Sequence, residues 1–172
     1  MEFGARSDQW PSEKKMITAY AAQDFPAIFQ SSDCEVMALS AQRTFWEKVT
    51  LLHVEFHRAE NNPTPQRLSR HYYDVYLLVG EPWLLKSALE QLELLDAVCR
   101  HKSIFFRSAW ARYKEACNGN LRLTPTTNRW YSIEKDYRQM REMIFGDIPT
   151  FEEITNRLGE LQKQINQERS QM

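Results

Sequence analysis

The residue types best suited to phosphate chemistry lie on two neighbouring segments in the first half of the chain. Arg70 and Asp74 are four residues apart, so they share one face if their segment is helical. Lys48 lies at the edge of an earlier apolar stripe, next to Leu52. If the two segments pack as antiparallel helices, Lys48 approaches Arg70 and Asp74. Such cations can serve as phosphate contacts; the alternative is that Lys48 reaches solvent and the Arg70–Asp74 pair is structural.

A second candidate surface is the basic and aromatic segment 100–114. Cations steer phosphates and aromatic rings stack on unpaired bases, so this segment could contact RNA. The phosphate contacts would then come from His101, Lys102 and Arg107. The alternative is that the aromatic rings lie in the core and the cations are solvated. The cations are Arg100, His101, Lys102, Arg107, Arg112 and Lys114, and the aromatic residues between them are Phe105, Phe106, Trp110 and Tyr113.

The histidines and cysteines form no recognised metal or redox motif. His53 and His57 are four residues apart, but Glu55 lies at the wrong offset for an H-E-x-x-H zinc pattern. We therefore expect both histidines at the surface. The three cysteines, without a C-x-x-C pair, suit neither a disulfide framework nor a zinc site, so reduced and mostly buried thiols are expected.

The composition is typical of one folded domain, or of one domain with a short appendage. The chain has 172 residues, which is within the usual size of a single domain. Its 12% aromatic content supports a real core, and its formal charge of −1 excludes a general attraction to nucleic acid. No apolar run approaches the roughly 18–20 residues that span a bilayer, and the first residues lack a signal-peptide core. A cytoplasmic protein without a membrane partner is expected.

Hydrophobic periodicity divides the chain into a short β-rich part, residues 1–39, and a helical part, residues 40–172. Alternating apolar residues predict three short strands, at Met1–Phe3, Met16–Tyr20 and Cys34–Leu39. Strands this short cannot form a stable sheet alone, so they need helices or further strands beside them. The predicted fold class is α+β and predominantly α.

About five helices are predicted after residue 40. Ser40 is a suitable N-cap for the first, and Pro65 suits the first turn of the second, which is apolar on more than one side and therefore central. Thr150 and Glu153 form a capping-box pattern at the start of the last helix. The expected spans are about 40–60, 65–79, 82–99, 130–145 and 150–172.

Several stretches of the chain resemble the nucleotidyltransferase toxins of abortive-infection systems, the AbiEii/AbiGii group. The resemblance rests on RTFWEKVTLLHVEFHR (43–58) and RLSRHYYDVYLL (67–78), with further support from EFGARSD near the start, from 101–113 and from 136–146. It implies a partial polymerase-β-like nucleotidyltransferase sheet followed by a bundle of helices. It also implies a nucleoside triphosphate substrate used with Mg²⁺, an RNA acceptor such as the tRNA 3′ end, and a cognate antitoxin as partner.

The same resemblance implies roles for individual residues. The family's Glu-Lys motif matches Glu47 and Lys48, with the lysine as a catalytic and nucleotide-binding phosphate contact. Its Arg-Asp-x-x-Asp motif falls on Arg70, His71 and Asp74, so Arg70 and Asp74 are nucleotide-binding candidates and Asp74 is also a catalytic one. His71 replaces the first aspartate of that motif.

One carboxylate of the family's metal site is matched by Glu2, which is thereby a candidate catalytic and metal-binding residue. The Gly-Ser turn and Asp-x-Asp pair that the family has ahead of this strand are absent from the sequence. Nucleotidyl transfer depends on charge stabilisation by bound metal, and Glu2 alone cannot hold a metal pair. We therefore expect the chain to be a C-terminal portion of such an enzyme and to be inactive by itself.

Two other functions remain open from the sequence. The first is a non-catalytic helical interaction or RNA-binding module, a decayed remnant of a toxin. The second is a structural oligomerisation domain that uses the last helix. Helical bundles serve many unrelated purposes, so the fold class does not choose among these functions.

Overall fold

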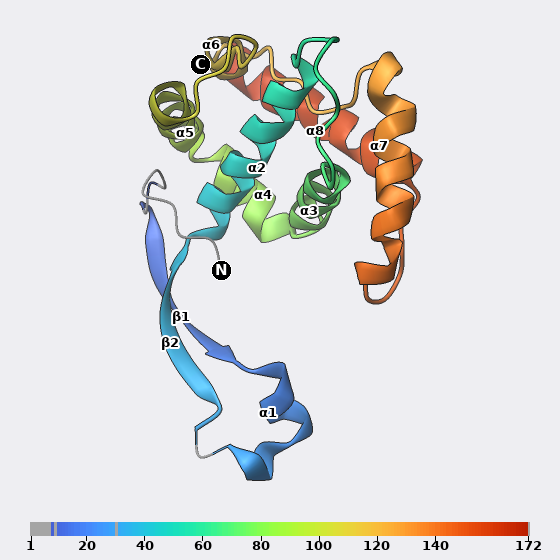
Figure 1. The fold of residues 1–172 in the computed structure, drawn as a ribbon. Helices are drawn as coiled ribbons and strands as arrows, with labels where there is room; N and C mark the ends of the chain where they lie inside the picture. The colour runs from blue at the N-terminus through green and yellow to red at the C-terminus, as the bar shows by residue number, and fades with distance from the viewer. Residues whose placement is uncertain (1–7, 9, 30, 172) are drawn as a thin grey trace.

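The computed structural model describes residues 8, 10–29 and 31–171, which form a hairpin followed by a helical body (Figure 1). The described part confirms the α+β, predominantly helical class, with two strands where three were expected; the strand expected at Met1–Phe3 lies outside the described residues. The elements are β1 (Ser12–Thr18), α1 (Tyr20–Asp24), η1 (Pro26–Ile28), β2 (Asp33–Leu39), α2 (Ala41–Phe56), α3 (Ser69–Val79), α4 (Pro82–Leu89), α5 (Leu92–Phe105), α6 (Tyr113–Cys117), α7 (Thr127–Met140), η2 (Arg141–Met143) and α8 (Phe151–Ser170).

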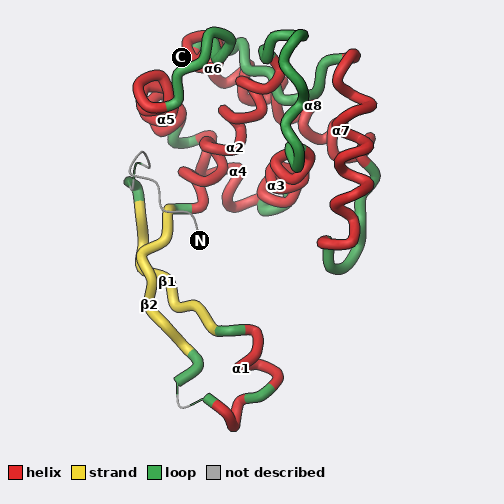
Figure 2. Tube along the Cα trace, viewed as in Figure 1, coloured by secondary structure: helices red, strands yellow, loops and turns green. Residues whose placement is uncertain are grey.

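The hairpin of β1 and β2 extends away from the helices, as Figures 1 and 2 show. Its strands are antiparallel, with Ser12 opposite Leu39 and Thr18 opposite Asp33. The first of these strands starts and ends earlier than expected. The connection between the strands contains α1 and η1 and exposes large apolar side chains, among them Tyr20, Phe25 and Ile28.

Helix α2 follows the hairpin and forms the centre of the site described below. Ser40 is its N-cap, as predicted, because the hydroxyl accepts a hydrogen bond from the Arg43 amide at 3.1 Å. Of the expected stripe, Phe45, Val49 and Leu52 are fully buried, and its last member, Phe56, is half-buried. Helix α2 therefore has its start and its inner face where local sequence patterns predict them.

Helix α3 begins at Ser69 and not at Pro65 as expected. Arg67 has a left-handed backbone, with a φ angle of 59°, which helical residues do not adopt. The start of α3 is stabilised from another helix, because the Asp136 carboxylate accepts hydrogen bonds from the Arg67 and Ser69 amides at 2.7 and 2.9 Å. The helix packs against α2, α4, α7 and α8, which confirms its central position.

The helix expected from Pro82 to Cys99 is two helices, α4 and α5, separated at Glu90 and Gln91. Helix α5 continues to Phe105, beyond the expected end, and the chain then leaves the helical conformation until α6. Arg112, at the end of this connection, has a left-handed φ angle of 45°. The connection 106–112 consequently crosses back toward α2, against which both α5 and α6 pack.

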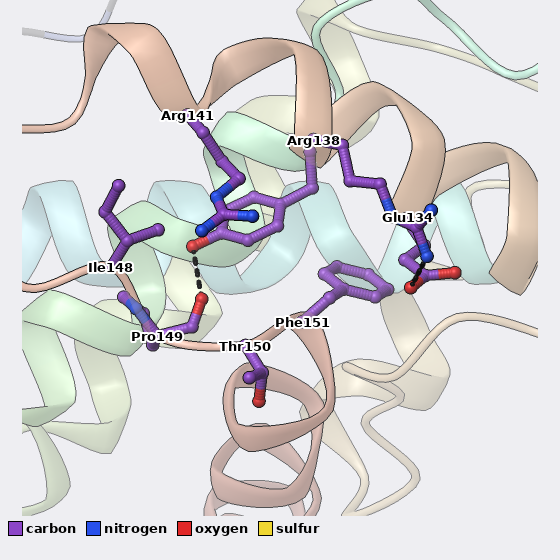
Figure 3. Close-up of a pocket in the computed structure, with 8 residues that line it drawn as sticks. Glu134, Arg138, Arg141, Ile148, Pro149, Thr150 and Phe151 are labelled. Atoms are coloured by element: carbon purple, nitrogen blue, oxygen red, sulfur yellow. Dashed lines mark hydrogen bonds and ion pairs between the residues drawn. The ribbon is translucent and has the colours of Figure 1, made fainter.

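The last two long helices, α7 and α8, meet at the junction drawn in Figure 3. The Tyr137 hydroxyl donates a hydrogen bond of 2.8 Å to the Pro149 carbonyl there. The capping box at Thr150 and Glu153 is present, as predicted. The predicted inner stripe of α8 is buried and consists of Ile154, Leu158, Leu161 and Ile165.

Among the described helices, none combines the length and the apolar character that crossing a membrane requires.

Candidate functional site

Lys48 on α2 and Asp74 on α3 lie against each other and form an ion pair. The two side chains are 28% and 35% exposed, so the pair is open to solvent on one side. His71, one turn before Asp74, places Nδ1 3.5 Å from the Lys48 ammonium. Lys48 and Asp74 are 26 residues apart in the chain. They therefore meet across α2 and α3, as antiparallel packing of these two helices predicts.

The imidazole of His71 is neutral at physiological pH. Burial, with the nearby charge of Lys48, lowers the pKa of His71 from 6.5 to about 4. A neutral ring nitrogen can accept a hydrogen bond from the Lys48 ammonium. The position that matches the first aspartate of the family's motif thus holds an uncharged ring beside the lysine.

Arg70 does not join this cluster. Its side chain is exposed, and within the described residues it makes no ion pair with Asp74, which pairs with Lys48. The expected Arg70–Asp74 pair is therefore wrong. Arg70 instead lines a separate cavity of about 300 Å³ beside Arg67 and Asp136.

Lys102 is buried and belongs to a charge network on the neighbouring turn of α2. Its ammonium donates to the Glu47 carbonyl at 2.7 Å and to the Thr50 hydroxyl at 2.8 Å, and lies 2.9 Å from a Glu47 carboxylate oxygen. These three acceptors match the three N–H groups of a lysine. Lys102 is therefore not the solvent-facing RNA contact that was expected, because a phosphate would have to displace one of these partners.

Glu47 is the centre of this network. Its carboxylate also accepts hydrogen bonds from Arg43, whose nitrogens lie 3.0 and 2.8 Å away. Burial acts to raise the pKa of Glu47, but the charges and hydrogen bonds of Lys102 and Arg43 outweigh it and hold the pKa below its ordinary value. Burial in turn lowers the pKa of Lys102. Glu47 is consequently a fixed anion beside Lys48.

Arg43 connects the front of the chain to this network. Its guanidinium is fully buried and donates to the Asp8 carboxylate at 2.9 Å and to the Trp10 carbonyl at 2.7 Å. Sequence reasoning missed Arg43, although it opens a second stripe on α2 that continues with Trp46 and Thr50. Glu2, the expected metal-binding carboxylate, lies outside the described residues.

A cavity of about 390 Å³ adjoins both clusters, between α2 and the segment 106–113. Leu51 and Val54 line it from α2, and Phe106 and Trp110 line it from the segment that follows α5. Lys48, Glu47, His71 and Lys102 also line it, so the cavity is continuous with the two charge clusters.

Arg58 also lines this cavity, and its guanidinium is held by Glu55 and by the ring of Trp110. Arg58 donates to both oxygens of Glu55 at 2.6 and 2.8 Å, and its guanidinium carbon lies 5.3 Å from the centroid of the Trp110 ring. The hydrogen bonds to Glu55 raise the pKa of Arg58. Neither Arg58 nor Ser108, which also lines the cavity, was expected from the sequence. For Arg58 the available signal was its spacing of three residues from Glu55, which allows an ion pair on one helix face.

The basic and aromatic segment 100–114 is neither an RNA-facing surface that includes all the expected cations nor a segment with its aromatic rings in the core. The side chains of Phe105 and Phe106 are 46% and 47% exposed, so these rings are not core residues. Arg107 is exposed beside them, and His101 is half-buried. An exposed surface with Arg107 and aromatic rings therefore exists, and it does not include Lys102.

His53 is fully buried, which corrects the expectation of a surface histidine. Its Nε2 lies 3.1 Å from the Arg112 carbonyl, and its Nδ1 accepts a hydrogen bond from the Arg122 amide at 3.1 Å. Burial lowers the pKa of His53 from 6.5 to about 4. The neutral ring carries its proton on Nε2 and joins two connections of the chain to α2.

The described residues do not provide a metal site. Across residues 8, 10–29 and 31–171, no three histidine, cysteine, aspartate or glutamate side chains are grouped as metal ligands. Cys99 is buried, Cys117 is half-buried and Cys34 is exposed, all as free thiols. A hydrogen bond with Cys117 and burial both raise the pKa of Cys99, so this thiol is no nucleophile.

Comparison with known families gives one match that covers most of the chain. The family model described as "Nucleotidyl transferase AbiEii toxin, Type IV TA system" matches residues 1–157. The matched range includes the hairpin, all helices from α1 to α7, and the first part of α8. No curated protein and no solved structure gives a significant match.

Proposed function

Because this chain belongs to the AbiEii family of nucleotidyl transferase toxins from type IV toxin–antitoxin systems, we propose that it contributes substrate-binding helices to nucleotide transfer onto RNA. The donor is a nucleoside triphosphate and the acceptor is the 3′ end of a tRNA. The acceptor hydroxyl attacks the α-phosphorus, a new phosphodiester bond forms and pyrophosphate leaves. Such a toxin acts in the cytoplasm, where its acceptor is found, and a cognate antitoxin is its partner.

The observation that carries this proposal is the meeting of Lys48 and Asp74 beside a cavity. The two residues occupy the positions that resemble two separate family motifs. Asp74 holds the ammonium of Lys48 in place, and the open side of the pair leaves the ammonium accessible to a phosphate oxygen. In this role Lys48 stabilises charge that develops during transfer, and Asp74 positions Lys48.

The residues described do not fit a catalytic metal. Asp74 is engaged by Lys48, and Glu47 is engaged by Arg43 and Lys102. The sequence contains no Gly-Ser turn and no Asp-x-Asp pair. We therefore propose that the chain by itself transfers no nucleotide, even with Mg²⁺ and Glu2 present.

A transfer assay with labelled nucleoside triphosphates, Mg²⁺ and total tRNA tests this proposal. The chain alone should give only background label in RNA. A chimera that joins it to the Gly-Ser and Asp-x-Asp part of an active family member should label tRNA. If the chain alone transfers label robustly, its proposed inactivity is wrong; if a folded chimera never does, the proposed catalytic function is wrong.

Lys48 is tested in the same chimera. Lys48→Ala should lower the transfer rate by about 100-fold, as loss of a single charge-stabilising donor does in other enzymes. Lys86→Ala is the matched control, because Lys86 is a lysine of α4 whose side chain is 78% exposed. Equal rates for the two variants would contradict the assigned role of Lys48.

RNA contact by His101 and Arg107 is a separate part of the proposal. It is supported by the exposed rings of Phe105 and Phe106 beside Arg107, since exposed aromatic rings and cations together bind unpaired bases. Arg107→Ala should weaken binding of tRNA and reduce its salt dependence, whereas Arg138→Ala on α7 should do neither. If a His101→Ala, Arg107→Ala variant kept the affinity for tRNA and its salt dependence unchanged, the proposed RNA contact at this surface would be wrong.

A non-catalytic RNA-binding or interaction module remains the second candidate function. One feature favours it, namely the neutral His71 at a motif aspartate. Reading the DNA ahead of the Met1 codon distinguishes the candidates. An in-frame Gly-Ser and Asp-x-Asp sequence would favour the enzyme, and stop codons in place of it would favour the non-catalytic module.

A further inference from the structure

We propose that the cavity between α2 and the segment 106–113 binds a nucleobase. The proposal deepens the proposed function, because the source of the base is either the nucleotide donor or the unpaired end of the RNA acceptor. The size of the cavity supports it first. About 390 Å³ is within the range of roughly 300–1,000 Å³ that is usual for small-molecule sites.

The walls of the cavity suit a flat, uncharged ring. Leu51 and Val54 supply an aliphatic wall from α2, and Phe106, Trp110 and Tyr113 supply an aromatic wall from the opposite side. Aromatic side chains bind bases by stacking, because every nucleobase has a π face. The Tyr113 hydroxyl donates to the Phe106 carbonyl at 3.1 Å and thereby fixes part of this wall.

The charge of the lining argues against a phosphate as the group that enters. Three cations line the cavity, but each is neutralised by a carboxylate, and the adjoining His71 is uncharged. An anion entering the cavity would have to break one of these pairs, whereas a neutral ring leaves all of them intact. The pairs are Lys48 with Asp74, Arg58 with Glu55, and Lys102 with Glu47.

Two residues that line the cavity carry a hydrogen-bond donor without a partner in the described part of the chain, and both donor atoms are covered from solvent, so each side chain must rotate to present its donor to a ligand. The Ser108 hydroxyl and the Trp110 indole N–H are both buried, and neither has a hydrogen-bond partner among the residues the structure describes. Buried polar groups normally have partners, so an unpartnered pair beside a cavity favours a ligand with acceptors. Nucleobases present such acceptors as carbonyl oxygens and ring nitrogens, which purely hydrocarbon rings lack.

The arrangement also explains how one nucleotide could use both parts of the site. Lys48 is at once a lining residue of the cavity and a member of the half-exposed pair with Asp74. A base inside the cavity would leave its sugar and phosphates toward that pair. The cavity thus selects the ring, and the lysine contacts the charged end outside it.

Titration calorimetry with the full chain tests this inference directly. The ligands are cytidine, uridine, adenosine and guanosine, none of which carries a phosphate, and a short single-stranded RNA ending in CCA. Saturable binding of nucleosides supports a free nucleotide as the source of the base. Binding of the RNA alone supports the acceptor end as the source. Sodium tripolyphosphate should not compete in either case.

Three variants locate the binding. Leu51→Trp fills the cavity without changing any charge and should abolish binding. Trp110→Ala should weaken binding by about tenfold or more, which is the usual loss when a stacking ring is removed. Trp110→Phe keeps a ring but lacks the N–H and should have a smaller effect. Trp83→Ala is the matched control, because Trp83 on α4 is 58% exposed and does not line the cavity.

The inference is overturned by any of three results on variants whose circular dichroism shows a folded protein. The first is no binding of nucleosides or RNA at millimolar concentration. The second is binding that Leu51→Trp and Trp110→Ala leave unchanged. The third is equal competition by benzyl alcohol, which would mean an aromatic-ring pocket without base recognition. Binding is measured without transfer, so an inactive chimera refutes the proposed catalysis and leaves this result standing.

Discussion

Acidification should destabilise this protein through two buried histidines, His53 and His71. Each imidazole is neutral in the folded chain, and burial lowers each pKa from 6.5 to about 4. Above pH 6.5 the rings are neutral in the folded and the unfolded state, so they add no pH dependence there. Between 6.5 and about 4 only the unfolded chain binds the extra protons, and the free energy of unfolding therefore falls as the pH falls.

The size of this effect follows from the two pKa values. One pKa unit corresponds to about 1.36 kcal/mol, so the fall from 6.5 to about 4 amounts to about 3 kcal/mol for His53 and a similar amount for His71. Each histidine contributes a slope of up to about 1.4 kcal/mol per pH unit within that range. Domains are stable by only about 5–15 kcal/mol, so both together should bring the protein close to unfolding near pH 4.

Urea unfolding at a series of pH values, followed by circular dichroism, measures this slope. The variant His53→Gln removes one titrating group and keeps an amide that can donate and accept hydrogen bonds. It should be less stable than the parent near neutral pH, but its stability should fall less steeply on acidification. The double variant with His71→Gln should lose most of this slope and keep the contribution of His57, whose pKa burial also lowers, until the carboxylates begin to titrate.

The carboxylates act in a lower range and can be separated from the histidines. Glu47 has a folded pKa below its ordinary value of 4.5, so its contribution is complete above that value and is lost only as the pH falls further. Constant stability from pH 7 to 5 in the parent would refute the reasoning. The same conclusion would follow if His53→Gln kept the full slope, because the buried ring would then not be the titrating group.

Three further perturbations test other parts of the fold. Lys102→Met should lower the stability by about 2 kcal/mol in urea unfolding, because the Glu47 carboxylate loses one of its charged hydrogen-bond partners and keeps Arg43; an unchanged midpoint would contradict the buried network. Asp136→Ala should cost about 1–2 kcal/mol and lower Tm, since Asp136 caps α3, whereas the exposed Asp147→Ala should not. The exposed apolar side chains of the hairpin predict self-association, which Ile28→Lys should reduce in sedimentation velocity because Ile28 is 76% exposed there; no association of the parent, or association that the variant leaves unaltered, would contradict this.

Helix starts and inner faces could be predicted because they depend on residues close together in the chain. The cap at Ser40 involves the amide of Arg43, and the capping box joins Thr150 to Glu153, three residues away in each case. The 3.6-residue period of a helix likewise places apolar residues on one face without reference to the rest of the molecule. The predicted start of α3 was wrong because the actual start depends on a residue far away in the chain. Asp136, which is 67 residues from Ser69, stabilises it.

The candidate site could be predicted only in part. The sequence alone indicated that Lys48 could meet the helix carrying Asp74, because a short connection makes two successive helices antiparallel neighbours. It did not determine that Lys48, in preference to Arg70, is the partner of Asp74. That choice depends on the rotation of α3 about its own axis, which is determined by its packing against four other helices.

Tertiary structure alone decided which polar residues are inside. Lys102 and His53 look like surface residues in the sequence, yet each is buried because partners 52 and 69 residues away satisfy its nitrogens. Burial of a polar group is tolerable only where such partners are in place, and no local pattern records them. The sequence determined the helices and the family, whereas the packing of the helices determined the cavity and the charges that line it.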